Sequence, residues 1–205
     1  MPDLVLYTHP FSRGRIAHWA LEEVGQPWEA RLVPLGEHRT PDFLALNPMG
    51  KIPTLVHGSV VVTEAPAICA YLADAFPEAG LAPAASDRGA YYRWLFFAAA
   101  CIEHALFDKH HGQIRADQRG AIGYGSFEDV VDTLEAAITP GPWVLGDRFS
   151  AADVYLGSQI EWGTGLMPLI EKRPAFEAYL ARCAAREAYV RAGQRTDALI
   201  AQLEG

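Results

Sequence analysis

The chain has 205 residues, half of them hydrophobic and a fifth charged, a balance typical of globular rather than disordered or fibrous proteins. Twenty-five acidic and seventeen basic residues give a net charge of −8, which argues against nucleic acid or an anionic membrane as a partner of the whole surface. The three cysteines form no CxxC pair, so we expect buried, reduced thiols and no metal site. The chain start lacks the basic flank and apolar core of a signal peptide, and no apolar run is long enough to cross a membrane. These features favour a cytoplasmic protein.

Strand and helix patterns alternate through the first 76 residues. Short β-branched or apolar runs predict four strands, and apolar residues at helical spacing predict three helices. A strand, a helix and a second strand within about 35 residues predict that the first two strands are parallel, and the last two read as a hairpin. This βαβ-ββα order predicts an α+β domain with a four-stranded mixed sheet. The expected strands are 4–7, 28–34, 54–56 and 60–63, and the expected helices are 14–25, 41–46 and 65–76.

The remainder of the chain carries only helical patterns. The segment 77–87 has no periodicity and is rich in Pro, Ala and Gly, so it is predicted to link a first domain, 1–76, to an all-α second domain, 88–205. Ser150 and Asp153 have the spacing of a capping box, which would fix the start of a core helix, and Phe149 can staple onto its first turn. The expected helices are 88–110, 127–138, 151–162, 175–183 and 185–203.

The stretch 47–68, NPMGKIPTLVHGSVVVTEAPAI, combines several backbone devices. A turn opens at Asn47, a glycine bends the chain, and a proline stands before the hairpin. Glu64 and Ala65 then begin a helix, so a carboxylate and free backbone N–H groups meet at one place. We expect a ligand-holding edge here.

Basic side chains are concentrated in the first fifty or so residues. This asymmetry suits a small anionic ligand, although a set of solvated surface arginines would give the same pattern. The residues are Arg13, Arg15, Arg31, His38, Arg39 and Lys51.

Three segments, GEHR (36–39), NPMGKIP (47–53) and TEAPAI (63–68), together resemble the cytosolic glutathione S-transferase family, and most of all its phi-like and bacterial branches with a serine-type site. The resemblance covers essentially the whole chain. It implies a thioredoxin-like first domain that binds glutathione as co-substrate, and a helical second domain that contributes a pocket for a hydrophobic electrophile. It also implies a homodimer.

The resemblance implies how glutathione is held. The backbone of Ile52 pairs with the cysteinyl part of the tripeptide, and the cis peptide bond before Pro53 turns backbone groups toward the ligand. Glu64 holds the γ-glutamyl ammonium, while Ala65 offers only its N–H to the γ-glutamyl carboxylate, since the family usually has serine there. Affinity for glutathione is therefore expected to be lower. His38 is expected to reach the glycyl carboxylate with help from Arg39 and Lys51, the alternative for His38 being a buried structural histidine.

Two hydroxyl groups compete for the catalytic position. Such enzymes lower the pKa of the glutathione thiol by donating a hydrogen bond to the thiolate. Ser12, in the loop after the first strand, is the preferred candidate, although it also suits an ordinary helix cap. Tyr7 is the alternative, and its other interpretation is a core aromatic at a strand end. A further set of aromatic residues has two interpretations, as a wall of the electrophile pocket or as part of a core or an interface: Phe11, Tyr91, Tyr92, Trp94 and Phe97.

The leading hypothesis is therefore a glutathione transferase. A non-catalytic module that uses the same fold for ligand binding or assembly is the alternative. A thiol-disulfide oxidoreductase is disfavoured because the loop after the first strand contains no cysteine.

Overall fold

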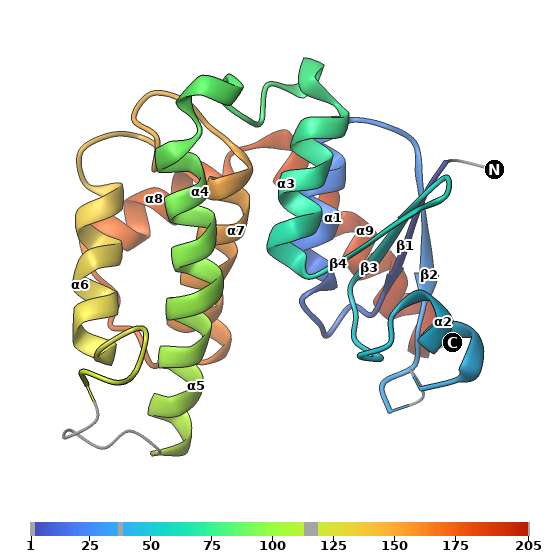
Figure 1. The fold of residues 1–205 in the computed structure, drawn as a ribbon, viewed down its shortest axis with the longest axis horizontal. Coiled ribbons are helices and arrows are strands. Elements are labelled where there is room, and N and C mark those ends of the chain that lie inside the picture. The colour runs from blue at the N-terminus through green and yellow to red at the C-terminus, as the bar shows by residue number, and fades with distance from the viewer. Residues whose placement is uncertain (1–2, 37–38, 113–118, 205) are drawn as a thin grey trace. The chain divides into compact units, whose positions relative to one another are not determined.

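The structure is a computed structural model, and it describes residues 3–36, 39–112 and 119–204. The chain forms two compact units, one made of Met1–Leu81 together with Ala185–Gly205 and the other of Ala82–Ala184. The compact units differ from the sequence domains at the C-terminal end, where the last helix joins the first unit. Each unit is described below by itself (Figure 1).

The first unit is built on a four-stranded sheet of order β2-β1-β3-β4. β1 pairs in parallel with β2 and antiparallel with β3, which in turn pairs antiparallel with β4. The mixed sheet and the parallel first pair confirm the prediction. The strands are β1 (Leu4–Thr8), β2 (Trp28–Leu32), β3 (Thr54–His57) and β4 (Val60–Thr63).

The β3–β4 hairpin turns at Gly58 and Ser59, between the paired residues His57 and Val60. Gly58 has φ 56°, a left-handed value that glycine adopts without steric cost. The turn residue therefore fixes the register in which β3 and β4 present their side chains.

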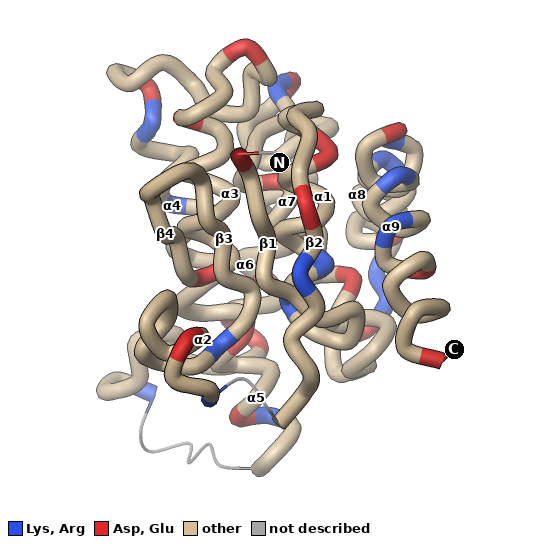
Figure 2. Tube along the Cα trace, turned by 90° about the vertical axis from the view of Figure 1, so that its right-hand side faces the viewer, with Lys and Arg blue, Asp and Glu red and all other residues tan. Residues whose placement is uncertain are grey.

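Helices cover the sheet unequally. Figure 2 shows α1 and α3 behind the sheet and the short α2 in front of one end. Leu4, Leu6 and Thr8 alternate inward along β1 and are buried, whereas Val5 and Tyr7 on the other face are half-buried. The helices are α1 (Gly14–Val24), α2 (Pro41–Leu46) and α3 (Ala65–Ala75).

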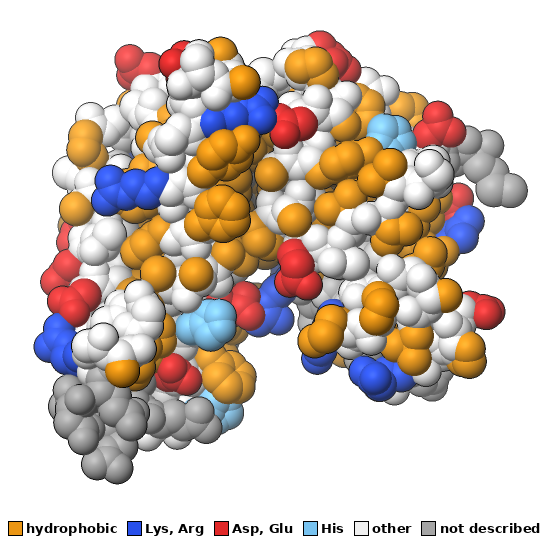
Figure 3. Space-filling view, viewed as in Figure 1, with side chains coloured by type: hydrophobic (Ala, Val, Ile, Leu, Met, Phe, Trp, Pro, Cys, Tyr) orange, Lys and Arg blue, Asp and Glu red, His pale blue; other side chains and the backbone are white. Residues whose placement is uncertain are grey.

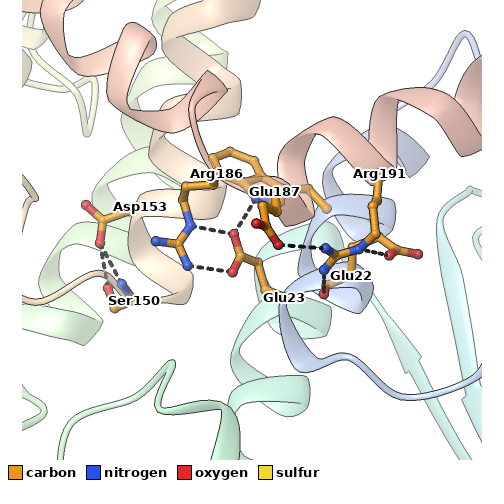
Figure 4. Close-up of polar contacts among 8 residues, drawn as sticks. Glu22, Glu23, Ser150, Asp153, Arg186, Glu187 and Arg191 are labelled. Atoms are coloured by element: carbon orange, nitrogen blue, oxygen red, sulfur yellow. Dashed lines mark hydrogen bonds and ion pairs between the residues drawn. The ribbon is translucent and has the colours of Figure 1, made fainter.

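The last helix, α9 (Glu187–Glu204), packs along α1. Arg186 forms a double ion pair with Glu23, with N–O distances of 2.6 and 2.7 Å. Arg191 pairs with Glu22, which is almost buried (Figure 4). Arg195 pairs with the same carboxylate. These pairs, added to the apolar contacts of α9, explain why this helix belongs to the sheet unit.

Among its described residues, 82–112 and 119–184, the second unit has helices and isolated bridges in the turn 143–148 as its regular secondary structure. Its core includes Tyr91, Ile102, Leu134, Phe176 and Tyr179, all almost fully buried. The helical prediction is confirmed, with the bounds of α6 as expected. The helices are α4 (Gly89–Phe97), α5 (Glu103–His111), α6 (Phe127–Ile138), α7 (Ala151–Glu161) and α8 (Pro174–Ala184).

Two π-helical segments interrupt this pattern. Ala98–Ile102 joins α4 to α5, and Trp162–Leu166 extends α7. The predicted single helix 88–110 is thus continuous but contains a wider turn. This turn rotates the side chains that follow it about the helix axis.

The predicted capping box is present at α7. Asp153 Oδ2 accepts from Ser150 N and from Ser150 Oγ, both at 2.9 Å. Asp153 Oδ1 accepts from Val144 N at 2.8 Å and from the Tyr179 hydroxyl at 2.7 Å. The carboxyl is fully buried, and burial raises its pKa above the usual range despite these donors. Asp153 therefore joins the α7 start, the 143–148 turn and α8. Phe149 stacks edge-on against Trp143.

The cysteines match the prediction in part. All three are free; Cys69 and Cys183 are buried, but Cys101 is only half-buried. Burial raises the pKa of the Cys69 thiol to about 12. Every helix among the described residues is too short or too polar to span a membrane.

Candidate functional site

Three chain segments leave the sheet at the same end. The register places Tyr7 of β1 beside Thr54 of β3, and Thr54 beside Thr63 of β4. The loop 9–13 after β1, the segment 50–53 before β3, and Glu64 after β4 therefore lie next to one another. Because α1 and α3 start directly after β1 and β4, the N-termini of both helices open at this edge.

Asn47 organises the segment before β3 from inside. It is 2% exposed, and its Nδ2 donates to Lys51 O at 2.8 Å and to Thr54 Oγ1 at 3.2 Å. Its Oδ1 accepts from Met49 N at 3.1 Å. One amide thus holds both ends of the bend that presents Ile52. From the sequence, Asn47 is predicted only as a turn residue, on the signal of an asparagine before a proline.

The peptide bond between Ile52 and Pro53 is cis. Pro53 is buried and Ile52 half-buried at the start of β3. Arg39 Nη1 donates to Met49 O at 3.3 Å, and Lys51 is exposed beside it. The predicted ligand His38 lies outside the described residues.

Among the residues that the structure describes, Glu64 is the one non-glycine residue with a positive φ, at φ 68° and ψ 118°. This conformation is sparsely populated for a residue with a Cβ and is characteristic of functional sites. Its side chain is exposed and forms no capping hydrogen bond with α3. The Glu64 carboxylate is therefore exposed next to the start of α3 without capping that helix.

The first turn of α3 adds backbone donors. The N–H groups of a first turn have no partner within their helix, and Ala65 is the first residue of α3. Pro66, the second, has no N–H to contribute. The donors of this turn and the positive end of the helix dipole favour an anion such as a carboxylate.

Ser12 lies in the loop before α1 and is half-buried. Its hydroxyl donates to His9 O at 2.7 Å, and its oxygen accepts from Gly14 N at 3.0 Å. These bonds are not the N-cap that the sequence offered as one role of Ser12, because the N-cap residue of α1 is Arg13 and no side chain caps this helix start. A serine has a single hydroxyl hydrogen, so a hydrogen bond from Ser12 to a ligand requires that hydrogen to turn away from His9 O.

Tyr7 lies on β1 with its hydroxyl occupied by a neighbouring strand. Arg31 Nη1 donates to the Tyr7 hydroxyl oxygen at 3.0 Å, and the Tyr7 ring packs on Phe43 of α2. Tyr7 belongs to the half-buried face of the sheet, whereas Thr8 faces the helices. These contacts fit the structural interpretation of Tyr7.

The aromatic residues named from the sequence divide by burial. Tyr91 and Trp94 belong to the core of the second unit, whereas Tyr92 is 42% exposed. Phe96, which the sequence analysis did not name, is 69% exposed, and Phe11 in the first unit is 66% exposed. Figure 3 shows hydrophobic side chains gathered along α4. Among the described residues no group of three or more His, Cys, Asp or Glu side chains is arranged to hold a metal.

This edge can therefore bind an extended anionic molecule. Two helix N-termini attract carboxylate or thiolate, Glu64 attracts an ammonium group, and the segment at Ile52 offers backbone for strand-like pairing. A half-buried hydroxyl, Ser12, lies at the start of one of the helices.

Models of two protein families match this chain. A glutathione S-transferase N-terminal domain matches residues 10–75, and a glutathione S-transferase C-terminal domain matches residues 83–182. A glutathione S-transferase, GST-4.5, from Xanthomonas campestris pv. campestris is 31% identical over 77% of this chain and 81% of its own.

Solved structures agree with this result. A glutathione transferase from Methylococcus capsulatus is 34% identical with a TM-score of 0.77, covering 95% of this chain and 98% of its own. A theta-class glutathione S-transferase from Xanthomonas axonopodis pv. citri, solved with glutathione bound, is 30% identical with a TM-score of 0.76. That likeness covers 94% of this chain and 97% of the other.

Proposed function

The chain belongs to the glutathione S-transferase family, and from that premise we propose that it binds glutathione at the sheet edge described above and activates its thiol through Ser12. The observation that carries the proposal is the register Tyr7–Thr54–Thr63, which brings Ser12, Ile52 and Glu64 to one end of the sheet. Glutathione has two carboxylates, one ammonium group and a peptide backbone, and this edge offers a complement to each.

In this proposal the tripeptide is held by both backbone groups and charged side chains. Ile52 pairs with its cysteinyl residue, as in an added strand, after the cis bond to Pro53. Glu64 receives the ammonium group, and the N–H of Ala65 receives the γ-glutamyl carboxylate. Arg39, Lys51 and His38 are assigned to the glycyl carboxylate. Because Ala65 lacks a hydroxyl, one hydrogen bond fewer is available than with serine at that position.

Ser12 acts on the sulfur. When a thiolate lies at the start of α1, the Ser12 hydroxyl turns from His9 O and donates to sulfur, while Gly14 N–H keeps the serine oxygen in place. The hydrogen bond and the helix dipole both favour the charged form, which lowers the pKa of the thiol. The thiolate then attacks an electrophilic carbon, forming a C–S bond as a leaving group departs or a double bond is saturated.

The remaining assignments extend the same proposal. The helical domain was predicted as 88–205 after the linker 77–87, and its part within the second compact unit, 88–184, contributes the pocket for a hydrophobic electrophile. The exposed apolar side chains of α4 support a homodimer as the working assembly. Free, buried thiols such as Cys69 support a reducing, cytoplasmic location.

Steady-state turnover with glutathione and a chloronitrobenzene electrophile tests the function. We expect glutathione-dependent product, and we expect Ser12→Ala to lower kcat by roughly 10²-fold, since a donor aimed at developing charge is worth that much. Tyr7→Phe is the matched control, because it also removes one hydroxyl from the β1 end, and it is expected to keep most of the activity. No glutathione-dependent rate in the unaltered protein, or equal rates for Ser12→Ala and the parent, would refute the proposal.

A further inference from the structure

The loop that carries Ser12 is connected to the C-terminal helix through a buried histidine. His18 of α1 is 0% exposed and contacts two threonine hydroxyls from distant parts of the chain. Its Nδ1 lies 3.0 Å from Thr196 Oγ1 of α9, and its Nε2 lies 3.2 Å from Thr8 Oγ1 at the end of β1. All three residues belong to the first compact unit.

The other partner of Thr196 fixes which group donates and which accepts in each of these two hydrogen bonds. Thr196 uses its single hydroxyl hydrogen for Ala192 O, at 2.9 Å, so its oxygen can only accept from His18. His18 therefore carries its hydrogen on Nδ1, and its bare Nε2 accepts the hydroxyl hydrogen of Thr8. Burial, together with the charges of Arg15 and Arg195, lowers the pKa of His18 to about 4, which keeps this neutral form at physiological pH.

Thr8 is packed against Gly14, which in turn holds the Ser12 oxygen. A Cβ on Gly14 would lie 1.9 Å from Thr8 Oγ1 and 3.0 Å from Ser12 Oγ. Gly14 is thus packed between the two hydroxyls, and its own N–H donates to Ser12 Oγ. The rotamer of Thr8, fixed by His18, sets how closely Gly14 approaches and hence where the Ser12 oxygen is held.

We propose that His18, anchored by Thr196 of the C-terminal helix, is a positioning residue that holds Thr8, Gly14 and Ser12 in the geometry needed to stabilise the glutathione thiolate. The inference rests on the function proposed for Ser12. It gives α9 an indirect role, because Thr196 of that helix helps to place the Ser12 hydroxyl. Because Ile52, Glu64 and Ala65 belong to other segments, the effect falls on the thiol and not on the binding of the tripeptide.

The sharpest variant is Thr196→Val, which keeps the shape and removes only the hydroxyl. We expect kcat to fall roughly tenfold, the pKa of the bound glutathione thiol to rise, and KM for glutathione to stay within about twofold. Thr196→Ser keeps the hydroxyl that accepts from His18 and should keep kcat near the value of the parent. Thr164→Val is the matched control, because Thr164 is also buried and donates to the carbonyl four residues earlier, but in the other unit.

Amide resonances of Ser12 and Gly14 give a readout independent of activity. Thr196→Val should shift both resonances, and Thr164→Val neither. His18→Asn, which loses the contact to Thr8, should shift them further. Melting temperatures and circular dichroism identify a variant that does not fold. If Thr196→Val or His18→Asn fails to fold, the other of the two is compared with Thr196→Ser.

The outcomes separate the two proposals. If the unaltered protein lacks glutathione-dependent turnover, the proposed function fails, while the amide shifts still decide whether His18 positions the loop. If turnover is present but folded Thr196→Val retains the parent kcat, thiol pKa and Ser12 and Gly14 resonances, the positioning role is overturned.

Discussion

The starts of α7 and α3 differ in how they treat the N–H groups of the first turn, which have no partner within a helix. At α7, Ser150 and Asp153 satisfy each other's backbone and side-chain groups (Figure 4). The carboxylate also accepts hydrogen bonds from two donors outside the helix. At α3, Glu64 has a strained backbone, its side chain forms no cap, and a proline occupies the first turn. The first arrangement uses the carboxylate for folding, and the second leaves carboxylate and N–H groups available to a ligand.

The contrast extends to solvent. Asp153 is fully buried and out of reach of solvent, so its carboxylate depends on hydrogen bonds from protein donors. Glu64 is exposed, and an exposed carboxylate remains solvated until a ligand displaces the water. Substitutions at the two helix starts should therefore affect different quantities, namely the free energy of unfolding at α7 and glutathione affinity at α3.

The largest effect is expected from Asp153→Ala. It leaves the N–H groups of Val144 and Ser150 and the hydroxyl of Tyr179 without an acceptor in the core, which should lower the free energy of unfolding by about 3–5 kcal/mol. Urea denaturation followed by circular dichroism measures it.

The control for that variant is Asp129→Ala at the start of α6. Asp129 pairs with Ser126 in a similar motif, but it is exposed, and Ser126 still caps the helix without it. The loss should be much smaller than at α7. Equal losses at the two positions would show that burial does not decide the strength of the cap.

The next effect is expected from Glu64→Ala. Removal of a charged hydrogen-bond acceptor for the glutathione ammonium should raise Kd for glutathione roughly tenfold or more, while the unfolding free energy changes little. Isothermal titration calorimetry gives Kd. Glu78→Ala, beyond the other end of α3, should leave Kd unchanged, and a Glu64→Ala protein that binds as tightly as the parent would contradict the assignment.

The smallest effect is expected from Ala65→Ser. A hydroxyl at the first position of α3 adds one hydrogen bond for the γ-glutamyl carboxylate, so Kd should fall about fivefold. Ala70→Ser, one turn and more along the same helix, is the control and should have no effect. If Ala65→Ser leaves Kd unchanged in a folded protein, the carboxylate is not bound at this helix start.

Local features of this fold could be predicted from the sequence. The hairpin at 54–63, α6 and the Ser150–Asp153 capping box depend on residues a few positions apart, and all three are present as expected. The stretch 47–68 could also be named as a ligand-holding edge from its turn, hairpin and helix start, whereas the roles expected for Ile52, Glu64 and Ser12 follow from the resemblance to the glutathione S-transferase family.

The rest depends on contacts between distant residues. The contact of His18 with Thr196 spans 178 positions, and nothing in the local pattern of either residue indicates the other. Likewise, Asn47 acts through the folded bend, and α9 joins the sheet unit through ion pairs with Glu22 and Glu23. The π-helical segments left no signal in the hydrophobic period from which the helices were predicted.

The pKa of the glutathione thiol in the binary complex tests the central claim most directly. It is read from the ultraviolet absorbance of the thiolate as pH is varied, in the parent and in Ser12→Ala, with Tyr7→Phe as control. We expect a thiol pKa below that of free glutathione in the parent and in Tyr7→Phe, and a raised value in Ser12→Ala with Kd for glutathione nearly unchanged. Equal thiol pKa values in the parent and Ser12→Ala would contradict it.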